Sequence, residues 1–184
     1  LLVLIIIKQT IDDIRIKNKN QVLEKKAYVD LQTGLPNKSK CEEMLNNYEY
    51  ITEPMGFVMF DLNNLKCAND TYGHAVGDQL ITNFARLLRN AIPAKDFVGR
   101  YGGDEFIAII TQTTKNEILK IMDEVHDEVR HFNENIHKVE VSYAYGYAFS
   151  EDYADCTIKT LFDKADKHMY ENKAIEKAKF EAIV

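Results

Sequence analysis

The sequence predicts an α/β domain in which helices flank a central mixed β-sheet. Apolar residues recur at helical spacing in several segments, and these segments alternate with short apolar runs typical of strands. A hairpin around residues 102–105 interrupts this alternation, so we expect a mixed sheet and not a wholly parallel one. With 184 residues and 46% apolar content, the chain suits one domain with a sizeable core plus an appendage.

The first half of the chain is predicted to contain two helices separated by a strand. A turn at residues 33–37 comes before a helix over residues 38–47. Residues 56–61, GFVMFD, form an apolar run that ends in a carboxylate, which is typical of a buried strand. A polar loop over residues 61–70 leads to a second helix, whose apolar stripe contains Leu80, Ile81, Phe84, Leu87, Leu88 and Ala91.

The second half begins with the hairpin and continues with a helix, a strand and a last helix. The third helix has apolar residues at Ile118, Met122, Val125, Val129 and Phe132. Residues 138–150, KVEVSYAYGYAFS, alternate as a strand does. The last helix has its apolar residues at Ile158, Leu161, Phe162, Ala165 and Met169.

Residues 1–26 are interpreted as an N-terminal helical linker and residues 27–184 as the globular domain. The chain begins with Leu, so we expect it to be a piece of a longer protein. Residues 1–7, LLVLIII, are too few to span a bilayer, which takes about 20 residues. We favour the cytoplasmic end of a membrane helix for this stretch, with an apolar stripe of an interdomain helix as the alternative.

The linker also has apolar residues at 3-4-3 spacing, namely Leu4, Ile7, Ile11 and Ile14. This spacing predicts a short coiled-coil seam, which fades at KNKNQ. A solvated linker helix is an equally good interpretation of the same residues.

The composition limits the partners that the chain can have. A net charge of −6 and a pI near 5.4 argue against double-stranded nucleic acid, which needs a basic face. A nucleotide is compatible with this charge where lysines and metal ions offset the phosphates. Three cysteines without metal-ligand spacing are interpreted as reduced thiols of an intracellular protein: Cys41, Cys67 and Cys156.

Residues 100–106, RYGGDEF, place two glycines and two acids between predicted strands. Glycine supplies the positive φ of a tight hairpin, which accounts for Gly102 and Gly103. Asp104 and Glu105 repel one another, and a turn alone does not account for both. If their strand neighbours the one that ends at Asp61, three carboxylates converge and need cations among them.

The predicted acid cluster suits magnesium. Two or three carboxylates with room for water and phosphate are typical of Mg²⁺ sites, and two such ions commonly assist displacement at phosphorus. Taken singly, Asp61 as a strand end and Asp104 as a turn residue have a simpler structural interpretation.

Residues 61–81 carry groups that suit a purine nucleotide. Backbone amides of the polar loop and Lys66 offer positive charge to phosphate, and Gly73 and Gly77 flank a helix start that favours anions. Asn69 supplies a donor and an acceptor, while Asp78 accepts only, which suits the N1–H and N2 amine of guanine. Singly, Asn69 fits a turn and Asp78 a first-turn helix acid.

Lys173 and Lys177 lie four residues apart on the last helix, so they share one face. They are interpreted either as a solvated face near a chain end or as two cations that reach the outer phosphates of a triphosphate.

Taken together, these segments resemble the GGDEF domain family, the diguanylate cyclases. The resemblance covers about residues 27–180 and rests on four ordered motifs: TGLPN at 33–37, FDLNNLKCANDTYGHAVGD at 60–78, RYGGDEF at 100–106 and ADKHMYENK at 165–173. One such string alone would be weak, whereas four in this order are highly specific. The resemblance implies a fold related to nucleotidyl cyclase and polymerase palm domains.

The resemblance implies that two GTP-loaded subunits of a homodimer meet face to face. Each GTP 3′-hydroxyl attacks the α-phosphate of the other GTP, which gives cyclic di-GMP and two pyrophosphates. Two Mg²⁺ ions per active site are implied, with Mn²⁺ as an alternative. Either Asp104 or a metal-bound water takes the hydroxyl proton. We expect a cytoplasmic domain of a bacterial protein anchored in the inner membrane through its N-terminal segment.

Residue roles follow from the same resemblance, position by position. The implied metal ligands are Asp61, Asp104 and the Leu62 carbonyl, and Glu105 beside them helps to orient metal or substrate. Gly102 and Gly103 let the substrate approach the hairpin closely. The implied guanine contacts are Asn69 and Asp78, and the implied phosphate contacts are Lys66, Lys173 and Lys177.

The sequence departs from the family pattern at several positions. Asn63 stands where many members have a second Asp, which lowers the negative charge of the site without removing a principal ligand. Gln32 stands where an apolar residue is frequent, and Lys177 where Arg is usual, so a bidentate fork is lost. The family's product-inhibition motif, Arg-x-x-Asp, is PAKD here, with Pro93 in place of the arginine and Asp96 retained. We expect no tight inhibition by cyclic di-GMP through this position.

The alternative function is that of a catalytically silent GGDEF domain that binds GTP as a sensor or serves as a dimerisation module. Such domains usually lose motif residues, and residues 102–106 are intact here. An active cyclase is therefore the favoured hypothesis. If a membrane sensor upstream sets the geometry of the dimer, we expect the isolated chain to turn over GTP slowly.

Overall fold

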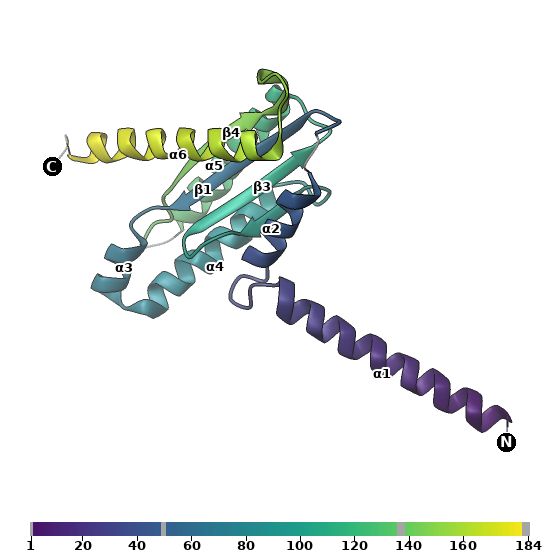
Figure 1. Cartoon of the computed structure of the whole chain (residues 1–184). Helices are drawn as coiled ribbons and strands as arrows, with labels where there is room; N and C mark the ends of the chain where they lie inside the picture. Colours follow the sequence, from purple (N-terminus) through teal and green to yellow (C-terminus); the bar gives the residue numbers. More distant parts are fainter. Residues whose placement is uncertain (1, 49–50, 136–138, 182–184) are drawn as a thin grey trace.

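A four-stranded antiparallel β-sheet forms the centre of the protein (Figure 1). The structure is a computed structural model that describes residues 2–48, 51–135 and 139–181. Within these residues the strand order is β2-β3-β1-β4, and the bounds are Met55–Leu62 for β1, Phe97–Arg100 for β2, Glu105–Thr111 for β3 and Tyr143–Phe149 for β4. The predicted α/β class, with helices flanking a central sheet, is confirmed.

The prediction of a mixed sheet is wrong, because every neighbouring pair of strands in the described residues is antiparallel. The helical crossovers do join strands of the same direction, β1 to β2 and β3 to β4. In each case, however, an antiparallel strand lies between the two: β3 separates β2 from β1, and β1 separates β3 from β4. An apolar run in the sequence does not show which strand will insert beside it.

Two helices, α4 (His74–Ala91) and α5 (Lys115–Glu134), cover one face of the sheet. Phe84 of α4 packs edge-on against Phe106 of β3 and against Phe60 of β1, with ring centroids 5.3 and 6.1 Å apart. A capping box between Thr114 and Glu117 fixes the start of α5. The apolar stripes predicted for both helices are therefore the residues that build this half of the core.

The other face is covered by α2 (Lys38–Asn47) and α6 (Ile158–Glu181), and Figure 1 shows α6 lying across the strands. The buried residues of α6 meet β1 and β4 at a stretch where β4 carries small side chains. A Cβ on Gly146 would contact backbone atoms of Ala165 and Met169. The small residue therefore sets how closely α6 approaches the sheet.

Helix α1 (Leu2–Tyr28) extends away from the sheet (Figure 1). Ile7, Ile11 and Ile14 of the predicted seam are each about half exposed, at 49%, 44% and 53%. The Leu4 side chain lies outside the described part, and the seam stays a prediction. No helix in the described residues combines the length and the apolar character needed to cross a membrane.

One α-helix was missed in the sequence, and the strand predicted over residues 138–150 is shorter, since β4 begins at Tyr143 and ends at Phe149. Residues Leu65–Tyr72, predicted as part of a polar loop, form the short helix α3. Its lack of an apolar stripe hid it, because only Ala68 is buried. Gly73, at φ +86°, ends α3 and starts α4, so the two helices meet at a residue that readily adopts this conformation. A 3₁₀ turn, Ser150–Asp152, follows β4.

Candidate active site

The acids predicted to cluster come from two adjacent strands. Asp61 of β1 lies directly opposite Glu105 of β3 in the antiparallel register, so both side chains point to the α6 face. The Leu62 amide donates a hydrogen bond of 2.9 Å to the Asp104 carbonyl, which joins the backbone of these two residues. The structure therefore brings Asp61, Leu62, Asp104 and Glu105 together at one end of the sheet.

A lysine from α6 neutralises part of this cluster. The Lys173 ammonium lies 2.6 Å from an Asp61 carboxylate oxygen, and the Asp61 side chain is only 11% exposed. Lys173 was predicted to contact phosphate, whereas in this structure it forms an ion pair with Asp61, one of the implied metal ligands. The side chain of Lys177, the second predicted phosphate contact on α6, lies outside the described residues.

Glu105 shows how concentrated the negative charge is. Burial raises the pKa of its carboxyl, and the nearby charges of Asp104, Asp61 and Asp166 raise it further, while Lys173 acts in the opposite direction. Within the described part of the chain, no group of three or more His, Cys, Asp or Glu side chains forms a metal site. The available donors are carboxylates and a backbone carbonyl.

The structure contradicts one of the two purposes predicted for the hairpin glycines. Neither Gly102 nor Gly103 has a positive φ, so the explanation from tight-turn backbone geometry is wrong. The four residues between the strands close through hydrogen bonds from the amides of Tyr101 and Gly102 to the Glu105 carbonyl. A Cβ on Gly102 would lie 2.5 Å from a Glu105 carboxylate oxygen, whereas one on Gly103 would meet nothing within 4 Å. Gly102 makes room for Glu105, and Gly103 leaves open space.

The start of α3, which follows β1 in the chain, lacks a side-chain cap from its N-cap residue. Its N-cap, Asn64, has a left-handed φ of 59° and makes no side-chain capping bond. The N-cap side chain therefore does not satisfy the first N–H groups of α3, and uncapped N–H groups at a helix start favour an anion. Lys66 lies in this first turn and is exposed. The predicted anion-binding loop is in fact a helix start.

The two predicted base contacts lie next to each other. The Asn69 side chain of α3 packs directly over Gly77, where a Cβ would collide with it. Asp78 is the next residue of α4 and is exposed. The short turn at Gly73 thus folds α3 back so that Asn69 reaches the residue beside Asp78.

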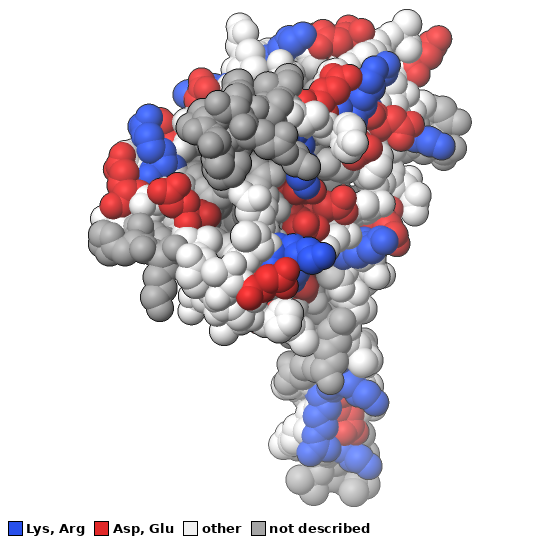
Figure 2. All heavy atoms as spheres, turned by 90° about the vertical axis from the view of Figure 1, so that its left-hand side faces the viewer, with Lys and Arg blue, Asp and Glu red and all other residues white. Residues whose placement is uncertain are grey.

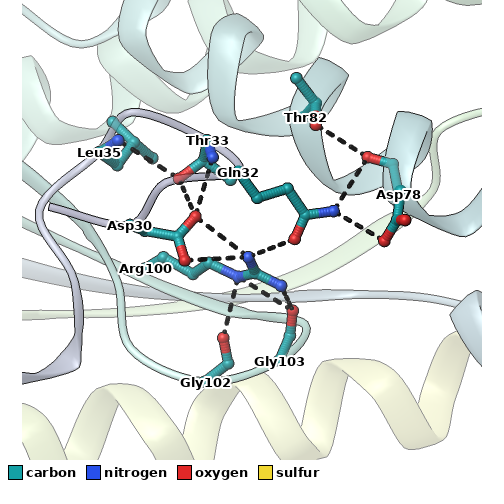
Figure 3. Close-up of polar contacts among 9 residues, drawn as sticks. All are labelled: Asp30, Gln32, Thr33, Leu35, Asp78, Thr82, Arg100, Gly102 and Gly103. Atoms are coloured by element: carbon teal, nitrogen blue, oxygen red, sulfur yellow. Dashed lines mark hydrogen bonds and ion pairs between the residues drawn. The ribbon is translucent and has the colours of Figure 1, made fainter.

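Sequence reasoning missed a polar network around Arg100 (Figure 3). The guanidinium contacts both Asp30 oxygens at 3.1 and 3.2 Å and the carbonyl of Gly103 at 2.8 Å. It also donates to Gln32 at 2.6 Å, and Gln32 in turn donates to Asp78 at 2.8 Å. The Asp30 carboxylate accepts hydrogen bonds from Thr33, a local pattern that the sequence D-x-x-T could have indicated.

Asn63, a departure from the family pattern, and Asp96, the residue retained from the product-inhibition motif, have clear structural positions. The Asn63 amide donates to the Ser142 hydroxyl at 3.1 Å, which ties this side chain to the segment before β4. The Asp96 side chain is fully buried and accepts from the Thr111 amide at 3.1 Å. Asp96 is thus engaged inside the fold, and the expected lack of tight product binding stays a prediction.

Figure 2 shows the end of the molecule toward which α3 and the C-terminal part of α6 point. Acidic and basic side chains are interspersed over the described part of this face and do not form one basic area. This mixed surface is compatible with a small anionic ligand that is held by a few placed cations.

Comparison with known proteins identifies the class to which this fold and site belong. Residues 27–179 match the family model described as "Diguanylate cyclase, GGDEF domain". This match covers most of the chain, so the chain belongs to the GGDEF domain family. The predicted boundary between residues 26 and 27 stays a prediction.

Among curated relatives, the chain is 28% identical over 172 residues to "Uncharacterized membrane protein SSP1970" of Staphylococcus saprophyticus, covering 88% of this chain and 48% of that protein. It is 27% identical over 165 residues to "Diguanylate cyclase A" of Treponema denticola, covering 85% of this chain and 44% of that protein. The chain thus spans about half the length of these relatives.

Among solved structures, the crystal structure of the coiled coil and GGDEF domain of DgcB from Caulobacter crescentus in complex with c-di-GMP superposes with a TM-score of 0.78. The sequences are 21% identical, and the match covers 92% of each chain. This likeness confirms the GGDEF fold.

Proposed function

We propose that this chain is an active diguanylate cyclase domain. Two GTP molecules are condensed into cyclic di-GMP. Each 3′-hydroxyl gives its proton to Asp104 or to a water molecule, and its oxygen forms a bond to the α-phosphorus of the other nucleotide. The bond from that phosphorus to the oxygen that bridges it to the β-phosphate breaks, and pyrophosphate leaves. The observation that carries this proposal is the juxtaposition of Asp61 with the intact hairpin motif, because Asp61 and Glu105 are cross-strand partners.

The donor set fits a hard divalent cation such as Mg²⁺, or Mn²⁺ in its place. Asp61 is a nearly buried carboxylate that already pairs with a cation, Lys173. Burial raises the pKa of the neighbouring Glu105 carboxyl, and the negative charges of Asp104 and Asp61 raise it further. The proposed ligands are Asp61, Asp104 and the Leu62 carbonyl, with Glu105 orienting metal or substrate. When bound, two such ions would neutralise phosphate oxygens and make the α-phosphorus more electrophilic.

The remaining residues bind and orient the nucleotide. Asn69 and Asp78 are proposed to hold the guanine edge, since Asp78 accepts from both guanine donors. The uncapped start of α3 and Lys66 are proposed to hold phosphate, as are Lys173 and Lys177. Gly103 leaves room for the substrate at the hairpin.

One domain offers one such site, whereas the product contains two nucleotides, so we propose that turnover takes place across a homodimer. The exposed stripe of Ile7, Ile11 and Ile14 on α1 is a suitable dimer seam. The coiled coil named for the Caulobacter structure is consistent with this arrangement. An N-terminal membrane anchor is also proposed, in line with the name of the staphylococcal relative.

The decisive test is incubation of the chain with GTP and Mg²⁺, followed by detection of cyclic di-GMP by mass spectrometry. Asp104→Ala should lower turnover by at least about 100-fold, because it removes a proposed metal ligand. Its melting temperature should stay close to that of the unaltered chain, since Asp104 lies in the hairpin turn. Asp127→Ala, an exposed acid on α5, is the matched control and should keep full turnover.

If the unaltered chain binds GTP but forms no product even at high protein concentration, the silent GTP-binding function replaces the cyclase. If Asp104→Ala keeps turnover, the proposed metal ligand is wrong.

A further inference from the structure

The Gln32 side chain connects Asp78, the proposed base contact, to Arg100, which bonds to the hairpin (Figure 3). Its amide nitrogen donates to Asp78 Oδ1 at 2.8 Å and lies 3.5 Å from the Asp78 carbonyl. Its amide oxygen accepts from Arg100 Nη1 at 2.6 Å. The same guanidinium donates to the carbonyls of Gly102 and Gly103. The Gln32 side chain therefore bonds to Asp78 of α4 and to Arg100 at the end of β2, and Arg100 in turn bonds to the hairpin.

The chemistry of the neighbours fixes the orientation of the Gln32 amide. Arginine only donates hydrogen bonds, so the amide oxygen must face Arg100. A carboxylate only accepts, so the NH₂ group must face Asp78. A flipped amide would place donor against donor and acceptor against acceptor. Gln32 is thus held in one orientation by two charged groups of opposite sign.

Asp78 needs such a partner, because it is an exposed residue near the start of α4 and a free carboxylate there has several rotamers. In the described part of the chain, only Oδ1 of this carboxylate accepts a hydrogen bond. A carboxylate has about four acceptor positions. The bond from Gln32 therefore restricts the rotamer of Asp78 and still leaves acceptor capacity on both oxygens for a purine edge.

The segment that carries Gln32 is itself anchored. Arg89 of α4 donates to the Gly34 carbonyl at 2.8 Å, and Thr33 is bonded to Asp30. These hydrogen bonds at Asp30 and Gly34 hold the backbone on both sides of Gln32, so the position from which its side chain reaches Asp78 is restricted.

We propose that Gln32 is a positioning residue that sets the Asp78 carboxylate for recognition of guanine and ties it to the hairpin through Arg100. This inference rests on the proposed function, in which Asp78 holds the guanine edge. An apolar residue at position 32 would have neither bond. Selectivity for guanine over a purine that lacks the N2 amine therefore depends on Gln32 in this chain.

The test uses three variants and two nucleotides. Gln32→Met keeps the length of the side chain and removes both hydrogen bonds. Gln32→Glu keeps the acceptor for Arg100 but places a carboxylate against Asp78. Leu31→Ala is the matched control, because Leu31 is the neighbouring residue and its side chain is 86% exposed. Equilibrium dissociation constants are measured for GTP and for inosine triphosphate, which lacks the N2 amine, with Mg²⁺ present.

The unaltered chain and Leu31→Ala should both prefer GTP over inosine triphosphate. Gln32→Met should weaken GTP binding by about tenfold and weaken inosine triphosphate binding less, so that the preference shrinks. Gln32→Glu should lose the preference as well, although its bond to Arg100 is kept. In the Asp78→Ala background, Gln32→Met should have no further effect on the preference, because the two residues act as one unit.

The inference is overturned if Gln32→Met weakens both nucleotides equally, since that is the result of a purely structural role. It is also overturned if Gln32→Glu keeps the preference, or if Gln32→Met has its full effect without Asp78. An unaltered chain that shows no preference for GTP would instead contradict guanine recognition itself, and with it the proposed function.

Discussion

Arg100 shows how much of this domain depends on one side chain. Its side chain is 12% exposed and joins the segment after α1, through Asp30 and Gln32, to the carbonyls of the hairpin. Its planar fork suits this task, because several fixed donors can bond to several acceptors at once. A lysine at this position would lose most of these bonds.

Asp30 is the partner of Arg100 whose contribution to stability should depend on pH. Burial raises the pKa of its carboxyl, but hydrogen bonds from Thr33 and Arg100 and the charge of Arg100 outweigh burial, so the pKa lies below its ordinary value. A lowered pKa in the folded state means that Asp30 stabilises the protein above its unfolded-state pKa, near 3.8, and that this stabilisation declines as the pH falls through the folded-state value.

Asp30→Asn should therefore lower the free energy of unfolding by about 1–2 kcal/mol at pH 7, and the difference from the unaltered chain should shrink as the pH falls below about 3.8. Denaturant unfolding of both proteins at several pH values measures this difference. A difference that stays constant from pH 7 to pH 3 would contradict the role of the ionised carboxylate.

At the scale of residues, the sequence predicted the acids that belong to motifs, but it did not predict hydrogen bonds between residues of different motifs. Asp61, Asp104 and Glu105 were expected to converge, and the register of β1 and β3 brings them together. The bond from Gln32 to Asp78 joins residues 46 positions apart, and the bond from Arg100 to Gln32 joins residues 68 apart. No local sequence pattern indicates such contacts. The sequence shows that Gln32 is polar at a position that is usually apolar, but it does not show that Asp78 and Arg100 are its partners.

At the scale of elements, the packing of α6 on β4 depends on the lack of a side chain at Gly146. The positions where a Cβ would collide are backbone atoms of Ala165 and Met169, and backbone moves much less easily than the end of a side chain. Because α6 also carries Lys173, the same close approach places that lysine on Asp61.

Gly146→Ala should lower the free energy of unfolding by about 3 kcal/mol, which corresponds to a fall in melting temperature of about 9 °C for a chain of this size. Thermal unfolding followed by circular dichroism measures it. Gly103→Ala is the matched control, because an added Cβ there meets nothing within 4 Å. Its melting temperature should equal that of the unaltered chain. Equal melting temperatures for both variants would contradict the tight packing of α6.

Elements with strong periodicity were predictable, and elements without it were not. The helix over residues 38–47 was predicted with its observed bounds, and the stripes of α4, α5 and α6 identified their buried faces. Helix α3 is polar on most of its surface, so its sequence resembled a loop. The direction of strands depends on which strand inserts between two others, and a single strand's composition does not encode this.

For the whole molecule, the proposed reaction needs two copies, so turnover should depend on protein concentration. Ile11→Asp combined with Ile14→Asp places two charges on the proposed seam of α1 and should weaken dimerisation. At low protein concentration, turnover per chain should fall by at least about tenfold, and it should recover as the concentration rises. Sedimentation velocity measures the dimer, and product formation measures turnover.

The matched control is Ile16→Asp, because Ile16 is 59% exposed but does not share the spacing of the seam. It should dimerise and turn over like the unaltered chain. Seam variants that remain dimeric and fully active would show that another surface joins the two copies.

The end of α1 has a mechanical consequence. Asn37 bonds to the carbonyls of Ala27 and Tyr28, and only Val29 separates Tyr28 from Asp30, which holds Arg100. Any rotation of α1 relative to the sheet would therefore be transmitted to Arg100 and the hairpin through these hydrogen bonds.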